Sequence, residues 1–101
     1  MQGKNQLKTQ AETLANFGIA SANWGDYPQA VSQLQEAIQQ CGDCASKAAL
    51  HKNLGLIECK SGNLNDGEKE LLIAKPLTPQ DPDVLQALNI VSAVHQKQKG
   101  P

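Results

Sequence analysis

The sequence predicts an all-α protein, built as a solenoid of antiparallel helix pairs with five helices. Two stretches repeat each other, Leu14-x-x-Phe17-Gly18 before Gly25-Asp26 and His51-x-x-Leu54-Gly55 before Gly62-Asn63. A repeated helical pair cannot bury its apolar face alone, so its copies stack on one another. Aromatic residues make up only 3% of the chain, and Ala, Leu, Ile and Val supply most of the apolar side chains. This composition favours closely packed helices over a β core.

Start and stop signals define the first two helices. Thr9-Gln10-Ala11-Glu12 has the spacing of a capping box, in which the Thr hydroxyl and the Glu carboxylate bond the free backbone N–H groups of the first turn. The first helix is therefore predicted to begin near Gln10 and to end before Gly25. Asp26, followed by Pro28 in the first turn, predicts the start of the second helix, and Gly42 predicts its end.

The later helices follow the same logic. Asp43 is the predicted cap of the third helix, and Asn63 or Asn65 that of the fourth. Pro76 is expected to close the fourth helix, and Gly67 inside it should cost about 1 kcal/mol relative to Ala. Asp81-Pro82-Asp83 is a strong start signal for the fifth. The predicted helices are 10–23, 26–40, 44–60, 63–75 and 82–98.

The length of 101 residues allows one small domain. We expect an N-terminal extension at 1–9, a single domain at 10–98 and a tail at 99–101. Inside the domain the first repeat covers about 11–44 and the second about 48–81, and the C-terminal helix covers about 82–98. Gly25 and Gly62, at the two hairpin turns, are 37 residues apart.

Charge and hydropathy restrict the partners. Nine lysines against ten acidic residues give a net charge of −1, which provides no electrostatic attraction for phosphate backbones, so we expect no nucleic-acid partner. No apolar run approaches the roughly 18 residues that span a bilayer, and the first ten residues are polar, so we expect no membrane partner either. The compartment is undetermined by the sequence. Three cysteines without a secretory segment weakly favour the cytoplasm.

The repeated residues resemble the tetratricopeptide repeat (TPR) family, whose motif reads Trp-x-x-Leu-Gly-x-x-Tyr, then Ala-x-x-x-Phe, Ala and Pro. The matching residues are Leu14, Phe17, Gly18, Ala30, Leu34 and Ala37 in the first repeat and Leu54, Gly55, Leu71, Ala74 and Pro79 in the second. Ala48 and Pro82 are 34 residues apart, which is the family period. The departures from the motif are Ser21, Gly42, His51, Glu58 and Gly67. Small residues such as Gly18 and Gly55 are expected where two helices cross closely.

The resemblance implies a right-handed superhelix whose concave groove, lined by the first helix of each pair, binds a peptide or a partner helix. Ile19, Leu56 and Ile90 fall at equivalent positions, as do Ala22, Cys59 and Ala93. The predicted groove residues are Asn16, Ile19, Asn23, Lys52, Asn53, Leu56, Lys60, Gln86 and Ile90. Lys52 and Lys60 are placed to orient an acidic group. Ala15 and Ile19 occupy the positions of the Lys and Asn that clamp a carboxylate in chaperone-binding members, so no chaperone tail is expected. The simpler interpretation is an ordinary solvated face.

The fifth helix has more apolar surface than a terminal helix needs. Leu88, Val91 and Val94 are therefore a candidate interface, covered by further repeats of a longer parent chain, by a second copy in a homodimer, or by a partner. Alternatively, the helix packs more deeply than the repeat template implies. For Trp24, at the end of the first helix, we favour packing at the edge of the fold over an exposed anchor.

Cys41-Gly42-Asp43-Cys44 is the one stretch with candidate chemistry, and three interpretations compete. Inert thiols or a disulfide that clips the linker is the first, because this spacing permits a disulfide. A metal site is the second, although a helix rising about 1.5 Å per residue places His51 and Cys59 too far from Cys44 to share one ion. A redox centre is the third, disfavoured because the chain lacks a βαβ context.

No motif points to catalysis. A glycine-rich phosphate loop, a paired-carboxylate motif and a His-Glu-x-x-His motif are all absent from the sequence. We therefore expect no enzyme, no catalytic residues and no cofactor or metal. Two functions remain open: a protein–protein interaction module or scaffold that binds a peptide in the groove, and a structural or self-association segment of a longer solenoid acting through the C-terminal helix.

Overall fold

The computed structural model describes the backbone of residues 3–99 and the side chains of residues 10–98. This part of the chain contains five α-helices and no strand, which confirms the all-α prediction and the number of helices. The helices are α1 (Gly3–Asn23), α2 (Tyr27–Cys41), α3 (Lys47–Lys60), α4 (Leu64–Leu77) and α5 (Pro82–Lys99).

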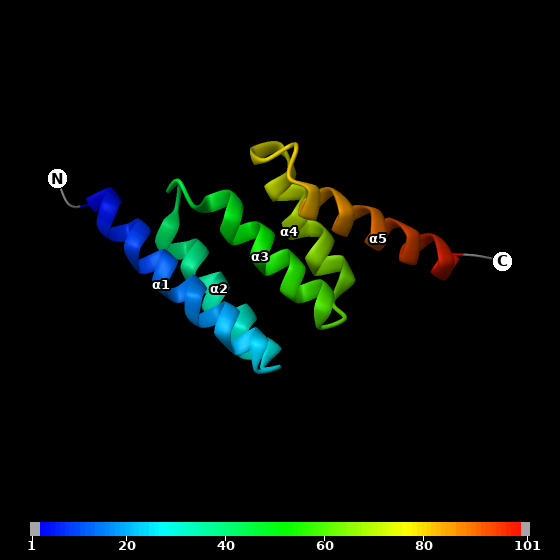
Figure 1. The fold of residues 1–101 in the computed structure, drawn as a ribbon, viewed down its shortest axis with the longest axis horizontal. Coiled ribbons are helices and arrows are strands. Elements are labelled where there is room, and N and C mark those ends of the chain that lie inside the picture. The colour runs from blue at the N-terminus through cyan, green and yellow to red at the C-terminus, as the bar shows by residue number, and fades with distance from the viewer. Residues whose placement is uncertain (1–2, 100–101) are drawn as a thin grey trace.

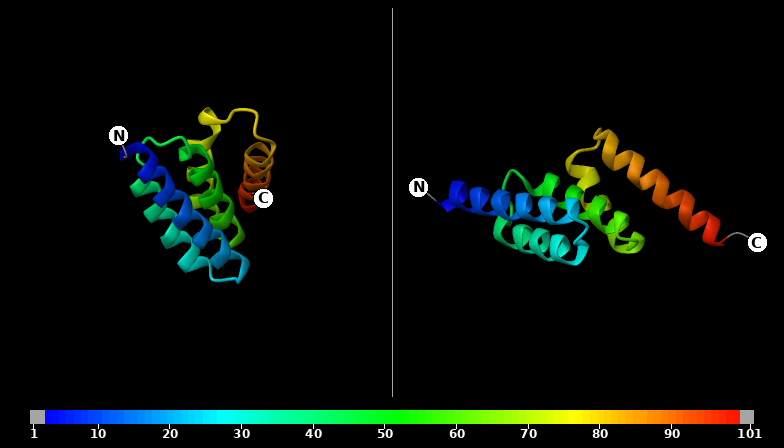
Figure 2. Two further views of the ribbon diagram at one scale, coloured as in Figure 1. Left: turned by 60° about the vertical axis from the view of Figure 1, so that its left-hand side comes forward. Right: turned by 60° about the horizontal axis from the view of Figure 1, so that its bottom comes forward.

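The helices form two antiparallel hairpins, α1–α2 and α3–α4, followed by the single helix α5 (Figure 1). The helices α1, α3 and α5 run in nearly the same direction, and α2 and α4 run the opposite way. The two hairpins and α5 follow one another across the molecule (Figure 2), which measures 58 × 29 × 18 Å. Because α3 contacts all four other helices, it is the central element of the fold.

Glycines with positive φ end the first three helices. Gly25, Gly42 and Gly62 have φ values of 85°, 59° and 95°, in the left-handed region that side chains disfavour. The predicted cap of α2 and the predicted start of α5 are confirmed. Asp26 accepts a hydrogen bond from the backbone N–H of Gln29 at 3.2 Å, and Asp81 accepts one from that of Asp83 at 2.9 Å.

Two predicted helix starts are wrong. The first helix begins at Gly3, so most of the predicted N-terminal extension is helical and the capping-box stretch lies inside α1. Nothing after Gly3 stops a helix, because the following residues are compatible with one. The third helix begins at Lys47 with Ser46 at its cap, because the linker before it is folded into turns by backbone bonds from Cys44 N–H to the Cys41 carbonyl and from Lys47 N–H to the Cys44 carbonyl.

The ends of the last two helices differ only slightly from the prediction. The fourth helix runs to Leu77 and carries Pro76 in its last turn, where the proline can donate no backbone hydrogen bond, and the helix ends one residue later. The backbone N–H of Thr78 then bonds the Ala74 carbonyl at 3.0 Å. The fifth helix continues to Lys99, within the usual uncertainty of helix boundaries.

The core consists of two clusters that meet at α3. The first cluster joins α1 and α2 to one side of α3 through the buried residues Ala11, Ala15, Ala30, Leu34, Ala37, Cys41, Leu50, Leu54 and Ile57. The second joins α4 and α5 through Leu71, Ala74 and Val84, with Leu56 and Cys59 of α3 packed against it. Each hairpin therefore depends on its neighbour for burial, as the repeat predicted.

The helix pairs cross at glycines, as expected for Gly18 and Gly55. A Cβ at Gly18 would lie 3.0 Å from Leu34 Cγ, and one at Gly55 would lie 2.7 Å from Leu71 Cγ and 3.0 Å from the Gly67 carbonyl oxygen. Helix propensity predicted that Gly67 weakens the fourth helix, and this interpretation is wrong. A Cβ there would collide with Cys59 Sγ and approach the Gly55 carbonyl oxygen to 2.9 Å, so the crossing of α3 and α4 requires both glycines.

Candidate functional site

The predicted groove residues come from α1, α3 and α5, which lie side by side and run in the same direction (Figure 1). We call them together the binding face: Asn16, Ile19, Asn23, Lys52, Asn53, Leu56, Lys60, Gln86 and Ile90. Contacts join the central helix α3 to each of the other two. Ser46 Oγ donates to Glu12 Oε1 at 3.5 Å between α3 and α1, and Lys52 Nζ lies 3.1 Å from Asp83 Oδ2 between α3 and α5.

The apolar residues of the binding face differ in exposure. Ile19 is 37% exposed and Ile90 is 55% exposed, whereas Leu56 is partly buried against the second core cluster. The neighbouring row is similarly mixed, because Ala22 and Cys59 pack against the core and Ala93 is exposed. The apolar surface available to a ligand is therefore concentrated on α1 and α5, on either side of the central helix.

Lys52 is already paired within the chain. Its ammonium lies 2.9 Å from Asp81 Oδ2 in the turn before α5 and 3.1 Å from Asp83 Oδ2 in the first turn of α5. The hydrogen bond to Asp81 raises the pKa of Lys52, and the same bond lowers the pKa of Asp81. Lys52 thus fastens α5 to α3, which corrects the expectation that it awaits an acidic ligand. Lys60 is exposed, and its role in orienting an acidic group stays a prediction.

The interface predicted on the fifth helix needs correction. Val91 is only 1% exposed, and Leu88 packs against Leu71, Ala74 and Val84. Val94 is partly buried. The alternative interpretation, in which the helix packs deeply against its neighbours, therefore agrees with the structure, and Val91 has no surface left for a second copy.

Two exposed aromatic residues lie on α1 and just beyond its end. Phe17 is 58% exposed, and Trp24, just beyond the end of α1, is 89% exposed, so the edge packing favoured for Trp24 is wrong. The repeat explains Phe17. Leu54 and Ile57 are the equivalents of Phe17 and Ala20 in the next hairpin, 37 residues later, and both are buried in the cluster shared with α1 and α2. No hairpin precedes α1 in the described part of the chain, so its corresponding stripe is open.

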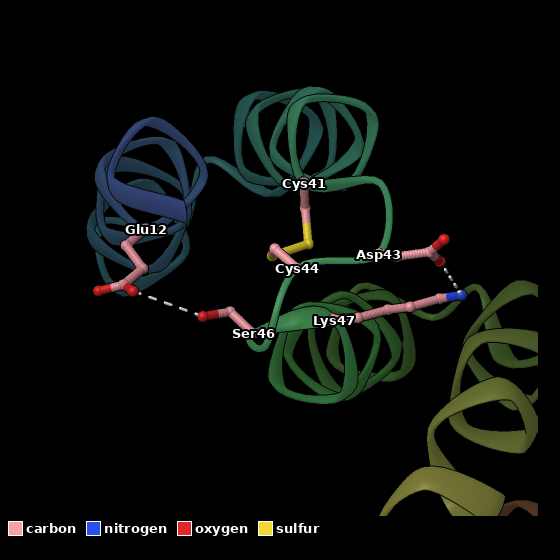
Figure 3. The surroundings of a disulfide bond; sticks show 6 residues. All are labelled: Glu12, Cys41, Asp43, Cys44, Ser46 and Lys47. Atoms are coloured by element: carbon pink, nitrogen blue, oxygen red, sulfur yellow. Dashed lines mark hydrogen bonds and ion pairs between the residues drawn. A yellow bond between two sulfur atoms is a disulfide. The ribbon is translucent and has the colours of Figure 1, made fainter. Parts of the chain in front are cut away.

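Cys41 and Cys44 form a disulfide across the linker from α2 to α3, with their Cα atoms 5.1 Å apart (Figure 3). Cys41 belongs to the first core cluster and is 4% exposed, and Cys44 packs against the same cluster. Lys47 and Asp43 form an ion pair at 3.5 Å beside it. Cys59 is a free thiol in α3, and burial raises its pKa, which makes it a poor nucleophile.

Reducing this disulfide should lower stability only modestly. Closing so short a loop removes little entropy from the unfolded chain, so we expect a loss of at most about 2 kcal/mol in the free energy of unfolding. Urea unfolding followed by circular dichroism, with and without a phosphine reductant, measures the difference. The variant Cys44→Ser in oxidising buffer should match the reduced wild type. A loss of about 4 kcal/mol or more in either case would mean that the linker, rather than the two core clusters, holds the hairpins together.

A buried polar cluster that the sequence reasoning did not identify lies between α3 and α4. His51 and Glu58 are 8% and 6% exposed, and His51 Nδ1 lies 2.7 Å from Glu70 Oε1. Burial, together with the nearby carboxylates of Asp66 and Glu70, raises the pKa of Glu58 to about 7. The repeat contained a signal for this cluster. Shifting the first hairpin by 37 residues places its neutral Ser21 and Gln33 on the acidic Glu58 and Glu70.

Metal binding and close relatives offer no further guidance. Among the residues that the structure describes, no group of three or more His, Cys, Asp or Glu side chains is arranged to hold a metal ion. None of the described helices combines the length and the apolar character that a membrane span requires.

Comparisons with protein-family models, with curated proteins and with solved structures each return no match.

Proposed function

We propose that this chain is a non-enzymatic, TPR-like protein–protein interaction module, which binds a peptide or a partner helix along the binding face in a scaffold or adaptor role. The observation that carries the proposal is the equivalence of Ile19, Leu56 and Ile90. They lie 37 and 34 residues apart, on three neighbouring helices that run in the same direction. Equivalent positions on such helices project the same way, so they form a row across one face.

The chemistry of the row suits an extended or helical ligand with apolar side chains. Ile19 and Ile90 are exposed, and exposed aliphatic side chains in a row favour burial against a partner. The amides of Asn16, Asn53 and Gln86 lie on the same three helices and can bond a peptide backbone. With Lys52 paired, the charge contributed to a ligand comes from Lys60.

Peptide selection tests this proposal. A phage library of random dodecapeptides is selected against the full chain, and the enriched peptides are synthesised and titrated by calorimetry. We expect Ile90→Asp to weaken their binding at least about tenfold, since it places a charge where apolar surface is buried. Leu72→Asp is the matched control, because Leu72 of α4 is similarly exposed at 52% and lies off the binding face. Peptides whose affinity falls with Leu72→Asp and not with Ile90→Asp would contradict the assignment.

A second candidate function is association through the outer stripe of α1. The open stripe that contains Phe17 and Ala20 favours it, because the equivalent residues of α3 are covered by a helical hairpin. Under this proposal the stripe stacks against a hairpin of another protein or of a further copy, and the chain serves as a structural segment of a longer assembly. Self-association through α5 is disfavoured, because Val91 is buried and Leu88 packs against the second core cluster.

The solution mass distinguishes the self-association form of this candidate. If two copies pair through α1, light scattering should give a dimer in reducing buffer, and Phe17→Asp should return it to a monomer. A dimer that appears only without reductant would assign the association to cysteines. A monomer under both conditions would exclude pairing of copies through α1.

A further inference from the structure

We propose that Glu58, Glu70 and His51 form a pH-responsive joint between α3 and α4, which holds the second hairpin closed while Glu58 is protonated and loosens it when Glu58 ionises. The proposal goes beyond peptide binding and does not depend on it. It rests on the burial of three ionisable side chains at a helix crossing and on a comparison between the two hairpins.

The two hairpins differ in the polar side chains that join their helices. In the first hairpin, Ser21 Oγ of α1 donates a hydrogen bond to Gln33 Oε1 of α2 at 2.8 Å, so a neutral pair joins the two helices. The equivalent positions of the second hairpin hold Glu58 and Glu70. The position equivalent to Leu14 holds His51, which bonds Glu70. A neutral bridge is therefore replaced by two carboxyl groups and an imidazole at the same crossing.

The crossing leaves these groups little access to water. Gly55 and Gly67 bring α3 and α4 together one turn away from Glu58, where neither could accommodate a methyl group without movement. Glu58 is 6% exposed, and the side chains of His51 and Glu70 are 10% and 17% exposed. Ionising a second carboxyl in this space costs free energy, because water cannot solvate it and the first carboxylate repels it.

Most of the charges near Glu58 raise its pKa. Those that shift its pKa all lie on α4: Asp66 and Glu70 raise it, and Lys69 lowers it by less. His51, on the same helix as Glu58, is engaged by Glu70. Among the side chains that the structure describes, α1, α2 and α5 add no charge that shifts the pKa of Glu58. The folded pKa of about 7 lies above the ordinary value of 4.5, so the folded state holds this proton more tightly than the unfolded state does.

Because the pKa of Glu58 is higher in the folded state than in the unfolded state, raising the pH destabilises the fold. Below pH 4.5 Glu58 is protonated in both states and has no effect on the pH dependence. Between pH 4.5 and about 7 the folding equilibrium constant should fall about tenfold per pH unit through this group, and above about 7 the loss is complete. The second hairpin is thus tightest in mildly acidic medium. Because α5 packs against α4 and α3, loosening of α4 also releases the position of α5.

The test compares pH profiles of the full chain. Urea unfolding is measured from pH 5 to 9 for the wild type, for Glu58→Gln, and for the double variant Glu58→Ser, Glu70→Gln, which transplants the neutral pair of the first hairpin. Between pH 5 and pH 9 we expect the wild-type equilibrium constant for folding to drop by roughly 75-fold relative to Glu58→Gln. The double variant should be as flat as Glu58→Gln. Glu36→Gln, at an exposed position of α2, is the control and should follow the wild type.

A direct titration keeps the proposal falsifiable if a variant fails to fold. The carbon-13 shift of the Glu58 carboxyl in the wild-type chain should titrate near pH 7, and amide exchange, corrected for its intrinsic pH dependence, should accelerate first in α3 and α4 as pH rises. A Glu58 midpoint near 4.5 would overturn the proposal. So would parallel unfolding profiles of the wild type and Glu58→Gln, or exchange that accelerates equally in both hairpins.

Discussion

Gly55→Val should reduce the free energy of unfolding by about 3–5 kcal/mol, a large part of the stability of a domain of this size. The first added carbon would lie 2.7 Å from Leu71 Cγ and 3.0 Å from the Gly67 carbonyl oxygen. The leucine can shift, but the carbonyl belongs to the backbone of α4 and moves only with the whole helix. Two further methyl groups then separate α3 from α4. Urea unfolding measured at pH 6, where Glu58 is largely protonated, gives the value.

Two controls separate crowding from helix propensity. Gln35→Val places the same residue at an exposed position of α2 and should change stability by no more than about 0.5 kcal/mol. Gly18→Val, the equivalent change in the first hairpin, should cost less than Gly55→Val, because its Cβ has 3.0 Å to Leu34 Cγ and 3.2 Å to the Ala30 carbonyl oxygen. If Gly55→Val were as stable as Gln35→Val, α3 and α4 could not cross as closely as described.

Leu34→Ala should cost about 3–5 kcal/mol, the range for emptying a fully buried leucine site. Leu34 is 0% exposed and lies in the first core cluster, which draws residues from α1, α2 and α3. The cavity therefore weakens both the first hairpin and its junction with the second. Backbone relaxation can fill little of it, because the opposing residue is Gly18, which has no side chain to extend.

The control for this change is Leu72→Ala in α4. Leu72 is 52% exposed, so its truncation removes little buried surface and should cost less than about 1 kcal/mol. Equal losses for the two variants would mean that the first cluster is not close-packed. A loss below about 1 kcal/mol for Leu34→Ala would lead to the same conclusion.

Local signals in the sequence predicted most of the secondary structure. Asp26 and Asp81 cap their helices, and glycines end α1 and α3, because these effects act within a few residues of the chain. The starts of α1 and α3 were missed. A capping-box pattern does not prevent a helix from running through it, and the turns and the disulfide of the linker displace the start of α3 to Lys47.

The candidate site was foreseen only in part. The row of Ile19, Leu56 and Ile90 was expected from repeat spacing together with the resemblance to the TPR family, and α3 does contact both α1 and α5. Spacing could not reveal that Lys52 is paired with Asp81, because that ion pair joins residues 29 positions apart through the fold. Nor could it reveal that Leu88 and Val91 are covered, since this depends on how deeply α5 settles against α4.

By itself, the sequence determined that the chain is helical, that it has five helices and where most of these helices end. Those properties depend on neighbouring residues and on a repeated pattern. Only the tertiary structure decided which apolar residues remain exposed, which charges are paired, and that Gly67 is required where propensity alone counts it a defect. The physical reason is that burial and close approach are set by the second helix at each crossing. No residue carries that information in its own sequence neighbourhood.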